Sequence, residues 1–262
     1  MRSFALRSII ILLIVLLIGC ANTPLKFYPD FPEQKLRITT GALLADVVVI
    51  DDMVGDTNKI DVVANKSLGG MVLTYFTEKL VEKGYHVDNT MLTSVGLLMD
   101  QHRLYKLVQS VRSKEVNVGE LPIGIPPFYL NDIFQKDTNA VAQLWSTYNT
   151  LINVTPQEEG AKMIIPAAVG VGKQAEASTL MVVFIGGYNV ASSKQYTDEL
   201  ASDAQTVGMV GVKHISQVTI AFYIVDALTG EVLWSDQYLS RGGTIHKEKI
   251  LHLADKIIDG LP

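Results

Sequence analysis

Runs of apolar residues with distinct periods predict most of the helices and strands of this chain. Near the start of the folded part, Val47 to Ile50 form an uninterrupted apolar run within residues 45–51, which predicts a buried strand. Apolar residues then recur at helical spacing from Leu68 to Val81, and Gly84 follows as a C-terminal stop. Tyr85 to Val87 predicts the next strand, so this region predicts a strand–helix–strand unit.

The spacing of apolar residues in the middle of the chain is less regular. It suits an amphipathic helix over residues 95–113 and a second helix over Val141 to Ile152, with Thr138 as the N-cap of the second. Two strands are predicted after these helices, at Lys162 to Ile165 and at Thr179 to Ile185.

The C-terminal part has the clearest pattern. Val218 to Val225 predicts a strand, Asp226 to Gly230 a tight turn with a positive φ at Gly230, and Val232 to Trp234 the returning strand. A last amphipathic helix is predicted over residues 247–259. Because strands and helices interleave, the predicted fold class is α/β, or α+β, with a mixed β-sheet flanked by helices, a late β-hairpin and a C-terminal helix.

The first residues of the chain have the pattern of an export signal. Arg2 and Arg7 give a positive start, and Ile9 to Ile18 is an apolar run of ten residues that ends before a small residue. In a helix, ten residues reach roughly 15 Å, about half of the hydrocarbon core of a bilayer. The sequence therefore predicts a cleaved signal peptide at residues 1–19 rather than a membrane-spanning helix.

The residues that follow this apolar run are Leu17-Ile18-Gly19-Cys20, and they resemble the lipobox of bacterial lipoproteins. The resemblance implies that Cys20 carries several acyl chains, so membrane lipid is a partner, and more than one chain anchors a protein stably. Ala21 stands where an aspartate retains lipoproteins at the inner membrane, which favours the outer membrane with the protein body in the periplasm. The alternative is an ordinary signal peptide followed by an incidental cysteine.

Beyond the signal, the chain divides into a short tether and one folded domain. Residues 20–44 contain Pro24, Pro29 and Pro32, so they predict a lipid-anchored tether, although their aromatic residues leave open that the segment packs on the domain. Removal of 19 residues leaves 243 of the 262, which is enough for one sizeable domain. We predict this periplasmic α/β domain over residues 45–262.

The composition narrows the classes of function. The signal contains two arginines, so the formal charge falls from −5 for the whole chain to −7 without it, and the sequence has no basic block. We therefore expect no binding to nucleic acid. Cys20 is the one cysteine of the sequence, so we expect no internal disulfide.

The residue patterns of common catalytic and cofactor sites are not evident. Gly170 to Lys173 is similar to a phosphate-binding loop, but it lacks the required glycine spacing, so a glycine-rich strand end is the better interpretation. Ser192, Ser193 and Lys194 fit a polar loop as well as a serine–lysine pair. We predict no catalytic residue, no cofactor and no metal, because metal-ligand spacing is lacking among the five histidines, His86, His102, His214, His246 and His252.

Two apolar stretches have more than one interpretation. Residues 178–190 lack the strict alternation of a membrane barrel strand, which favours a central buried strand. Pro126 to Leu130 fits an exposed loop that binds a partner, but aromatic residues in such a loop more often fill the edge of a core.

Three segments occur together that point to a family: the strand Val47–Asp51, the helix end Glu82–Tyr85, and the hairpin Val225–Trp234 with its Asp-Ala-Leu-Thr-Gly turn. Together they resemble the superfamily of periplasmic lipoproteins that includes the curli-secretion lipoprotein CsgG and the TolB amino-terminal-like domains. The resemblance covers residues 45–88 and 158–260, whereas the intervening residues have no counterpart.

The resemblance implies binding and assembly at the cell envelope rather than catalysis, with envelope or secretion proteins as partners and self-association left open. The predicted function is an outer-membrane lipoprotein that faces the periplasm and acts as a non-enzymatic protein-binding or assembly factor. One alternative is an oligomeric export-channel subunit of the curli-secretion type, with membrane hairpins in residues 174–217. Another is an envelope hydrolase with an unrecognised site. Lipidation of Cys20 is the one residue role that we assign.

Overall fold

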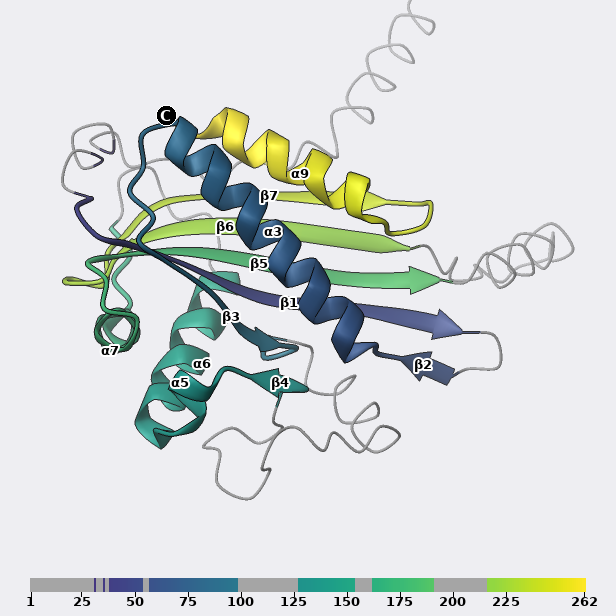
Figure 1. Cartoon of the computed structure of the whole chain (residues 1–262), viewed down its shortest axis with the longest axis horizontal. Helices are drawn as coiled ribbons and strands as arrows, with labels where there is room; N and C mark the ends of the chain where they lie inside the picture. Colours follow the sequence, from purple (N-terminus) through teal and green to yellow (C-terminus); the bar gives the residue numbers. More distant parts are fainter. Residues whose placement is uncertain are drawn as a thin grey trace, which may run out of the picture.

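A β-sheet runs through the molecule, and helices cover both of its faces (Figure 1). The structure is a computed structural model that describes residues 31, 35, 38–53, 57–98, 127–153, 162–190 and 216–262. In chain order, its elements are β1 (Gly41–Met53), β2 (Thr57–Lys59), α3 (Val62–Glu82), β3 (Asn89–Val95), β4 (Tyr129–Leu130), α5 (Asp132–Gln135), α6 (Thr138–Ile152), α7 (Pro166–Gln174), β5 (Thr179–Val190), β6 (Gln217–Asp226), β7 (Val232–Arg241) and α9 (Lys247–Gly260). The seven-stranded sheet has the order β4-β3-β1-β5-β6-β7, with β2 paired to β1 beside this path.

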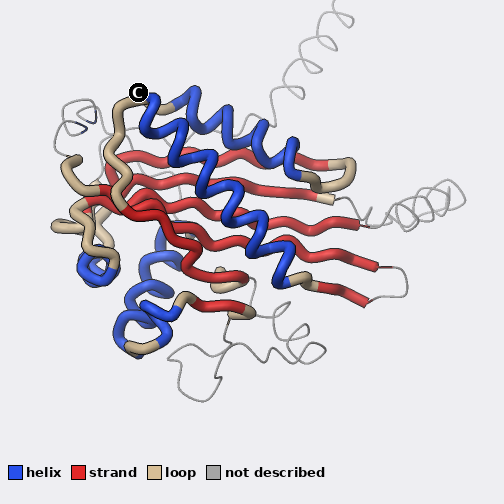
Figure 2. The backbone as a smooth tube through the Cα atoms, in the orientation of Figure 1, coloured by secondary structure: helices blue, strands red, loops and turns tan. Residues whose placement is uncertain are grey.

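The sheet is mixed, and the predicted fold class is confirmed. β1 runs parallel to β3 and to β5, while β6 and β7 continue the sheet in antiparallel fashion. β1, β3 and β5 therefore end on one side of the sheet, which we name the carboxyl edge. They begin on the opposite side, the amino edge, where the turn between β6 and β7 also lies because Asp226 pairs with Thr179 (Figure 2).

Each face of the sheet packs its own hydrophobic core. Leu43, Ala45 and Val47 of β1 belong to the core beneath α3 and α9, whereas Ala42 and Leu44 belong to the core beneath α5, α6 and α7. This is the alternation with a period of two that a strand imposes on its side chains. Burial of each large apolar side chain contributes about 1.5–3 kcal/mol, so the two cores hold the three layers together.

The predicted strand–helix–strand unit is present as β1, α3 and β3, with one correction. Gly84 has a φ of 81° and ends α3 as expected. Tyr85 then donates its backbone N–H to the Leu80 oxygen at 2.9 Å and buries its ring. The strand predicted at Tyr85 to Val87 is wrong, because the first of these residues completes the end of the helix, and β3 begins only at Asn89.

Two helix predictions also change. α6 has nearly the predicted extent, but its N-cap is Asp137, whose side chain accepts a backbone hydrogen bond of the first turn at 2.8 Å, and not Thr138. Val95 ends β3, and Gly96 turns the chain with a φ of 82°. The helix predicted over residues 95–113 therefore does not start at its first residue, and its part after residue 98 lies outside the described residues.

The predicted strand at Lys162 to Ile165 is reduced to a single β-bridge between Ile164 and Glu231. Pro166 occupies the first turn of α7, where its fixed φ suits a helix start. Gly170 to Lys173 consequently lie in a helix, which corrects their interpretation as a strand end.

The folded part begins earlier than residue 45, because β1 starts at Gly41. Phe31 and Ile38, which precede the strand, are buried in the core beneath α3 and α9. Part of the segment predicted as a tether, residues 20–44, therefore packs on the domain. Cys20 and the signal peptide lie outside the described residues.

The C-terminal predictions are confirmed. β6, the turn with a φ of 79° at Gly230, β7 and α9 all lie where the pattern placed them. β7 is the last strand in the sheet order. Its Asp236 is buried, and burial raises the pKa of this carboxyl above the usual range.

Candidate functional site

A cavity of about 220 Å³ lies at the carboxyl edge, between the first turns of α3 and α9. The end of β1 forms its floor, and the loop before α9 forms one wall. In α/β sheets, ligands bind preferentially beyond the carboxyl ends of the parallel strands. The cavity is lined by Val49, Asp61, Ala64, Asn65, Leu68, Ile245, His246, Lys247 and Ile250.

The first wall is the start of α3, which Asp61 fixes as N-cap. The Ala64 backbone N–H donates to Asp61 Oδ1 at 2.8 Å, which satisfies one of the amides that every helix start leaves without a partner. Asp61 thus lines the cavity with one of its carboxylate oxygens already bound.

Asn65 joins this wall to the sheet. β1 pairs with β3 up to Asp46 and with β2 from Asp51, both on the side away from β5, so Val49 lies between the two partners. The Val49 N–H donates to Asn65 Oδ1 at 2.6 Å, and Asn65 Nδ2 donates to the Val49 oxygen at 3.0 Å. The buried Asn65 amide therefore satisfies the backbone N–H and oxygen of Val49 where no neighbouring strand does so, and it holds α3 against β1.

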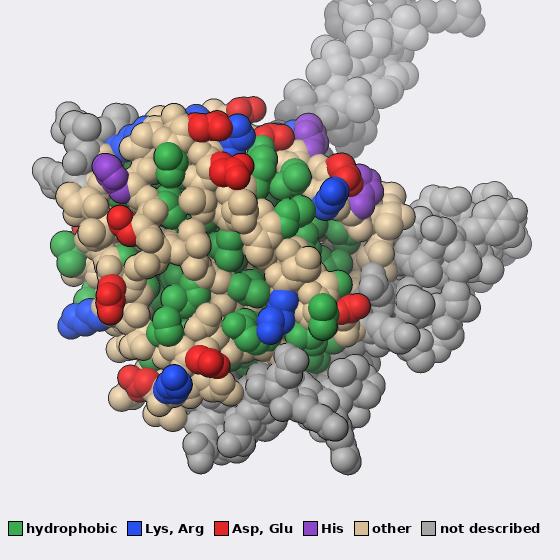
Figure 3. Space-filling model, in the orientation of Figure 1, with side chains coloured by type: hydrophobic (Ala, Val, Ile, Leu, Met, Phe, Trp, Pro, Cys, Tyr) green, Lys and Arg blue, Asp and Glu red, His purple; other side chains and the backbone are tan. Residues whose placement is uncertain are grey.

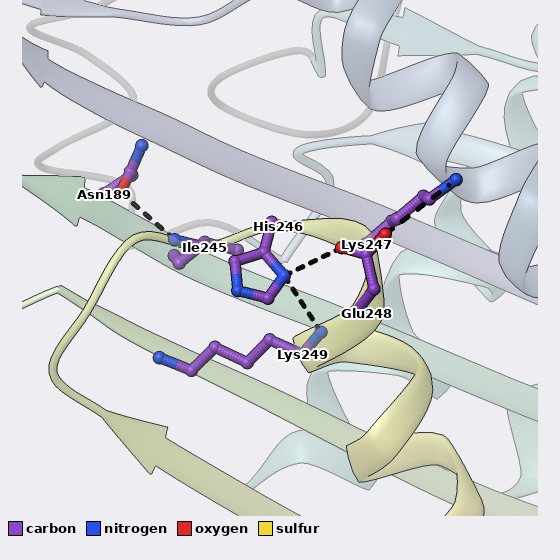
Figure 4. Close-up of polar contacts among 6 residues, drawn as sticks. All are labelled: Asn189, Ile245, His246, Lys247, Glu248 and Lys249. Atoms are coloured by element: carbon purple, nitrogen blue, oxygen red, sulfur yellow. Dashed lines mark hydrogen bonds and ion pairs between the residues drawn. The ribbon is translucent and has the colours of Figure 1, made fainter.

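The opposite wall is the start of α9, with His246 as N-cap (Figure 4). His246 Nδ1 accepts the Lys249 backbone N–H at 3.3 Å and lies 2.9 Å from Glu248 Oε2. Before the helix, the Ile245 N–H donates to Asn189 Oδ1 of β5 at 3.3 Å, which ties this wall to the sheet.

The charges at the mouth of the cavity are mixed. Lys247 Nζ is 3.9 Å from Glu248 Oε1, and both side chains are about two-thirds exposed. The pKa of the Glu248 carboxyl is lowered, first by its own backbone N–H at the helix start and then by His246 and Lys247. Acidic, basic and apolar side chains are also interspersed over the face of α3 and α9 (Figure 3). This face therefore carries no charge of a single sign.

The size of the cavity limits its occupant. Pockets for drug-sized ligands span about 300–1,000 Å³, whereas an engineered cavity of about 150 Å³ holds benzene. The volume here, about 220 Å³, fits one large side chain or a small ring. The apolar part of the lining consists of Val49, Ala64, Leu68, Ile245 and Ile250.

The sequence patterns did not predict this site. No metal ligand was predicted among the histidines, and His246 is the N-cap of α9. The described residues contain no group of three or more His, Cys, Asp or Glu side chains that could hold a metal. His102, His214 and the Ser192–Lys194 segment lie outside the described residues. Asp61 had a detectable signal, because an aspartate directly before an apolar helical pattern is a typical N-cap.

The other sequence features have structural explanations. In α7, a Cβ on Gly172 would overlap Ala227, so close packing rather than phosphate binding explains this glycine, whereas a Cβ on Gly170 would meet the flexible end of the Gln143 side chain. Phe128 is fully buried and Tyr129 lies in β4, which confirms that these aromatic residues fill a core edge.

Within the window considered for membrane hairpins, residues 174–217, the described strand residues are those of β5 and the first residue of β6, and they belong to the sheet. β5 is paired on both sides, with β1 and with β6, and Thr179 to Ile185 are buried as predicted for a central strand. Residues 191–215 lie outside the described residues. Within the described ranges, no helix has the length and apolar character needed to cross a membrane.

The structure is an α/β protein with a cavity at the carboxyl edge of a mixed sheet. Among solved structures, the crystal structure of lipoprotein GNA1162 from Neisseria meningitidis is similar, with a TM-score of 0.29 and 11% sequence identity. The match covers 83% of this chain and 96% of that chain. No protein-family model and no curated protein matches the chain, so the resemblance to the CsgG and TolB superfamily stays a prediction.

Proposed function

We propose that this protein is a lipid-anchored, non-enzymatic binding protein of the bacterial cell envelope, and that the carboxyl-edge cavity holds a large apolar side chain of a partner polypeptide. The cavity carries this proposal. It is preformed, mostly apolar and of a size suited to one side chain. A preformed site lowers the entropy cost of binding.

The state of the polar lining groups supports binding rather than chemistry. The Asn65 amide is engaged by the backbone of β1, Asp61 and His246 each cap a helix, and Lys247 is exposed at the mouth. Among the described residues that line the cavity, none is a serine, threonine or cysteine. We therefore assign no catalytic residue.

The cellular location is proposed from the sequence. The signal pattern at residues 1–19 and the lipobox ending at Cys20 support a protein acylated on that cysteine, and Ala21 supports the periplasmic face of the outer membrane. Envelope or secretion proteins are then the partners within reach.

Cavity binding is tested by NMR titration with N-acetyl-phenylalanine amide as the probe and N-acetyl-serine amide as its polar control. For a ligand of this size, about 0.3 kcal/mol per heavy atom gives a Kd near about 1 mM. We expect the aromatic probe to shift the methyl signals of Ala64, Leu68 and Ile250 in a saturable way, and the serine amide to leave them unchanged.

A matched pair of variants identifies the cavity as the binding site. Ala64→Trp puts bulk into the mouth, whereas Ser67→Trp adds the same bulk to an exposed position of α3 outside the lining. The first should abolish the shifts and the second should preserve them. Equal binding by both variants, or saturable binding of the serine amide, would contradict the proposed use of the cavity.

A further inference from the structure

The amino edge, opposite the cavity, exposes two large apolar side chains. Leu228, at the tip of the β6–β7 turn, is 73% exposed, and Ile164 is 60% exposed. Ile164 forms a bridge with Glu231, and the Ile165 N–H donates to the Gly230 oxygen at 2.7 Å, so the two side chains belong to neighbouring segments. We name Ile164 and Leu228 the amino-edge patch.

The turn fixes the exposure of Leu228. Asp226 Oδ1 accepts the Leu228 N–H at 2.7 Å and the Thr229 N–H at 3.3 Å, and Gly230 donates to the Asp226 oxygen at 2.7 Å. Glu231 is paired with Lys162 at 2.9 Å. The carboxylates of Asp226 and Glu231, which lie on either side of Leu228 in the chain, therefore have partners within the protein.

The start of β1 lies beside this patch. Thr40, directly before β1, donates to Ser178 Oγ at 2.8 Å, and the Ala227 N–H donates to the Ser178 oxygen at 2.8 Å. Ser178 thus links the start of β1 to the turn that carries Leu228. Figure 1 shows the start of β1 and this turn at the same end of the sheet.

The entry point limits the distance between the domain and the lipid anchor. Phe31 is buried in the domain, and residues 21–30 separate it from Cys20. Since an extended chain spans at most about 3.6 Å per residue, Cys20 lies within about 40 Å of Phe31. The segment before β1 lies at the end of the domain that bears the patch, because Lys35 donates to the oxygens of Lys83, just after the end of α3, and of Pro262.

We propose that the amino-edge patch rests on the lipid surface in which Cys20 is anchored, so that the carboxyl-edge cavity faces away from that membrane. This inference rests on the proposed lipid anchor. Tethering raises the effective concentration of the patch at the lipid surface, so a contact too weak to bind a free protein suffices to orient an anchored one. Leucine and isoleucine enter the boundary between headgroups and acyl chains.

The orientation is tested on the acylated protein reconstituted in vesicles of phosphatidylethanolamine and phosphatidylcholine. Leu228→Cys and Val63→Cys are each labelled with an environment-sensitive thiol dye, and quenching by a nitroxide lipid is measured. Val63 is the matched control, because it is 76% exposed and lies in the first turn of α3 at the carboxyl edge.

We expect several-fold stronger quenching at position 228 than at position 63, with little change in high salt, because the contact is apolar. Adding Ile164→Asp to the Leu228→Cys variant should remove most of this difference while circular dichroism remains that of the parent.

Three other outcomes would overturn the proposal, and they have different meanings. Weak and equal quenching at both positions, with acyl chains on Cys20 confirmed by mass, removes the patch contact but keeps the anchor. Stronger quenching at position 63 places the carboxyl edge on the lipid and favours the export-channel alternative. Reaction of the dye with Cys20 shows a free thiol, which removes the lipid anchor and the orientation with it.

Discussion

Asp46 shows how one buried carboxylate organises the end of β3. It is 2% exposed in β1 and accepts hydrogen bonds from Ser94 Oγ at 2.7 Å and from the backbone N–H groups of Leu97 and Leu98 at 3.1 Å each. Burial raises the pKa of the Asp46 carboxyl, although these hydrogen bonds act in the opposite direction. The carboxylate holds the turn that follows β3.

Substitution of Asp46 should change the free energy of unfolding in two ways, through the lost hydrogen bonds and through the raised pKa of the carboxyl. Asp46→Ala leaves two buried backbone N–H groups without partners and should cost at least about 2 kcal/mol. Because the folded-state pKa is raised, the folded protein binds the proton more readily, so this group adds stability as the pH falls from the folded-state pKa towards the unfolded value near 3.8. Urea unfolding of the wild type and Asp46→Asn between pH 7 and pH 4 measures this contribution.

The expected sign is specific. The stability of the wild type relative to Asp46→Asn should rise as the pH is lowered, because only the wild type can take up the proton. A difference that stays constant, or that falls with the pH, would mean that the Asp46 carboxyl is not raised in the folded state.

At the scale of the element, two glycines in helices have opposite surroundings. Gly172 of α7 approaches the β6–β7 turn so closely that an added Cβ would overlap Ala227, whereas nothing lies within 4 Å of a Cβ added to Gly70 of α3. Gly172→Ala should therefore destabilise the protein by about 1–3 kcal/mol. Gly70→Ala should stabilise it by up to about 1 kcal/mol. Guanidinium unfolding of the two variants, each a change from Gly to Ala in a helix, tests this packing. Stabilisation by both substitutions would show that Gly172 is not closely packed against Ala227.

The elements that the sequence predicted well are those with a local cause. Val47 to Ile50 are apolar in sequence, and α3 has both its apolar spacing and its terminal glycine within one segment. α7 was missed because its glycines are poor helix formers, and the contact that requires Gly172 is with Ala227, far along the chain. The cavity likewise combines Val49, the start of α3 and the loop before α9, and no local pattern shows that these segments meet.

At the scale of the whole molecule, the segment before β1 is part of the structure. Phe31 is fully buried with residues of α3 and α9, and Lys35 donates to the Lys83 and Pro262 oxygens at 3.0 Å each. Phe31 and Lys35 therefore attach the segment before the sheet to the domain.

Loss of the contacts that Phe31 makes should lower the stability of the entire domain. Phe31→Ala removes a fully buried aromatic side chain, and such changes cost about 3–5 kcal/mol. Val81→Ala, at an exposed position of α3, is the control and should change the stability by less than about 0.5 kcal/mol. Thermal unfolding measures the melting temperatures of both variants. Equal melting temperatures would show that Phe31 does not contribute to the core.

The position of Asp236 in β7 has a consequence for the behaviour of the protein at high concentration. β7 is the last strand of the sheet, and a terminal strand is a template on which other chains can add to form fibrils. Natural sheets resist this with inward-pointing charges, and the buried carboxyl of Asp236 is such a group. A residue that lowers the stability of one folded molecule can thus keep many molecules from aggregating at high concentration.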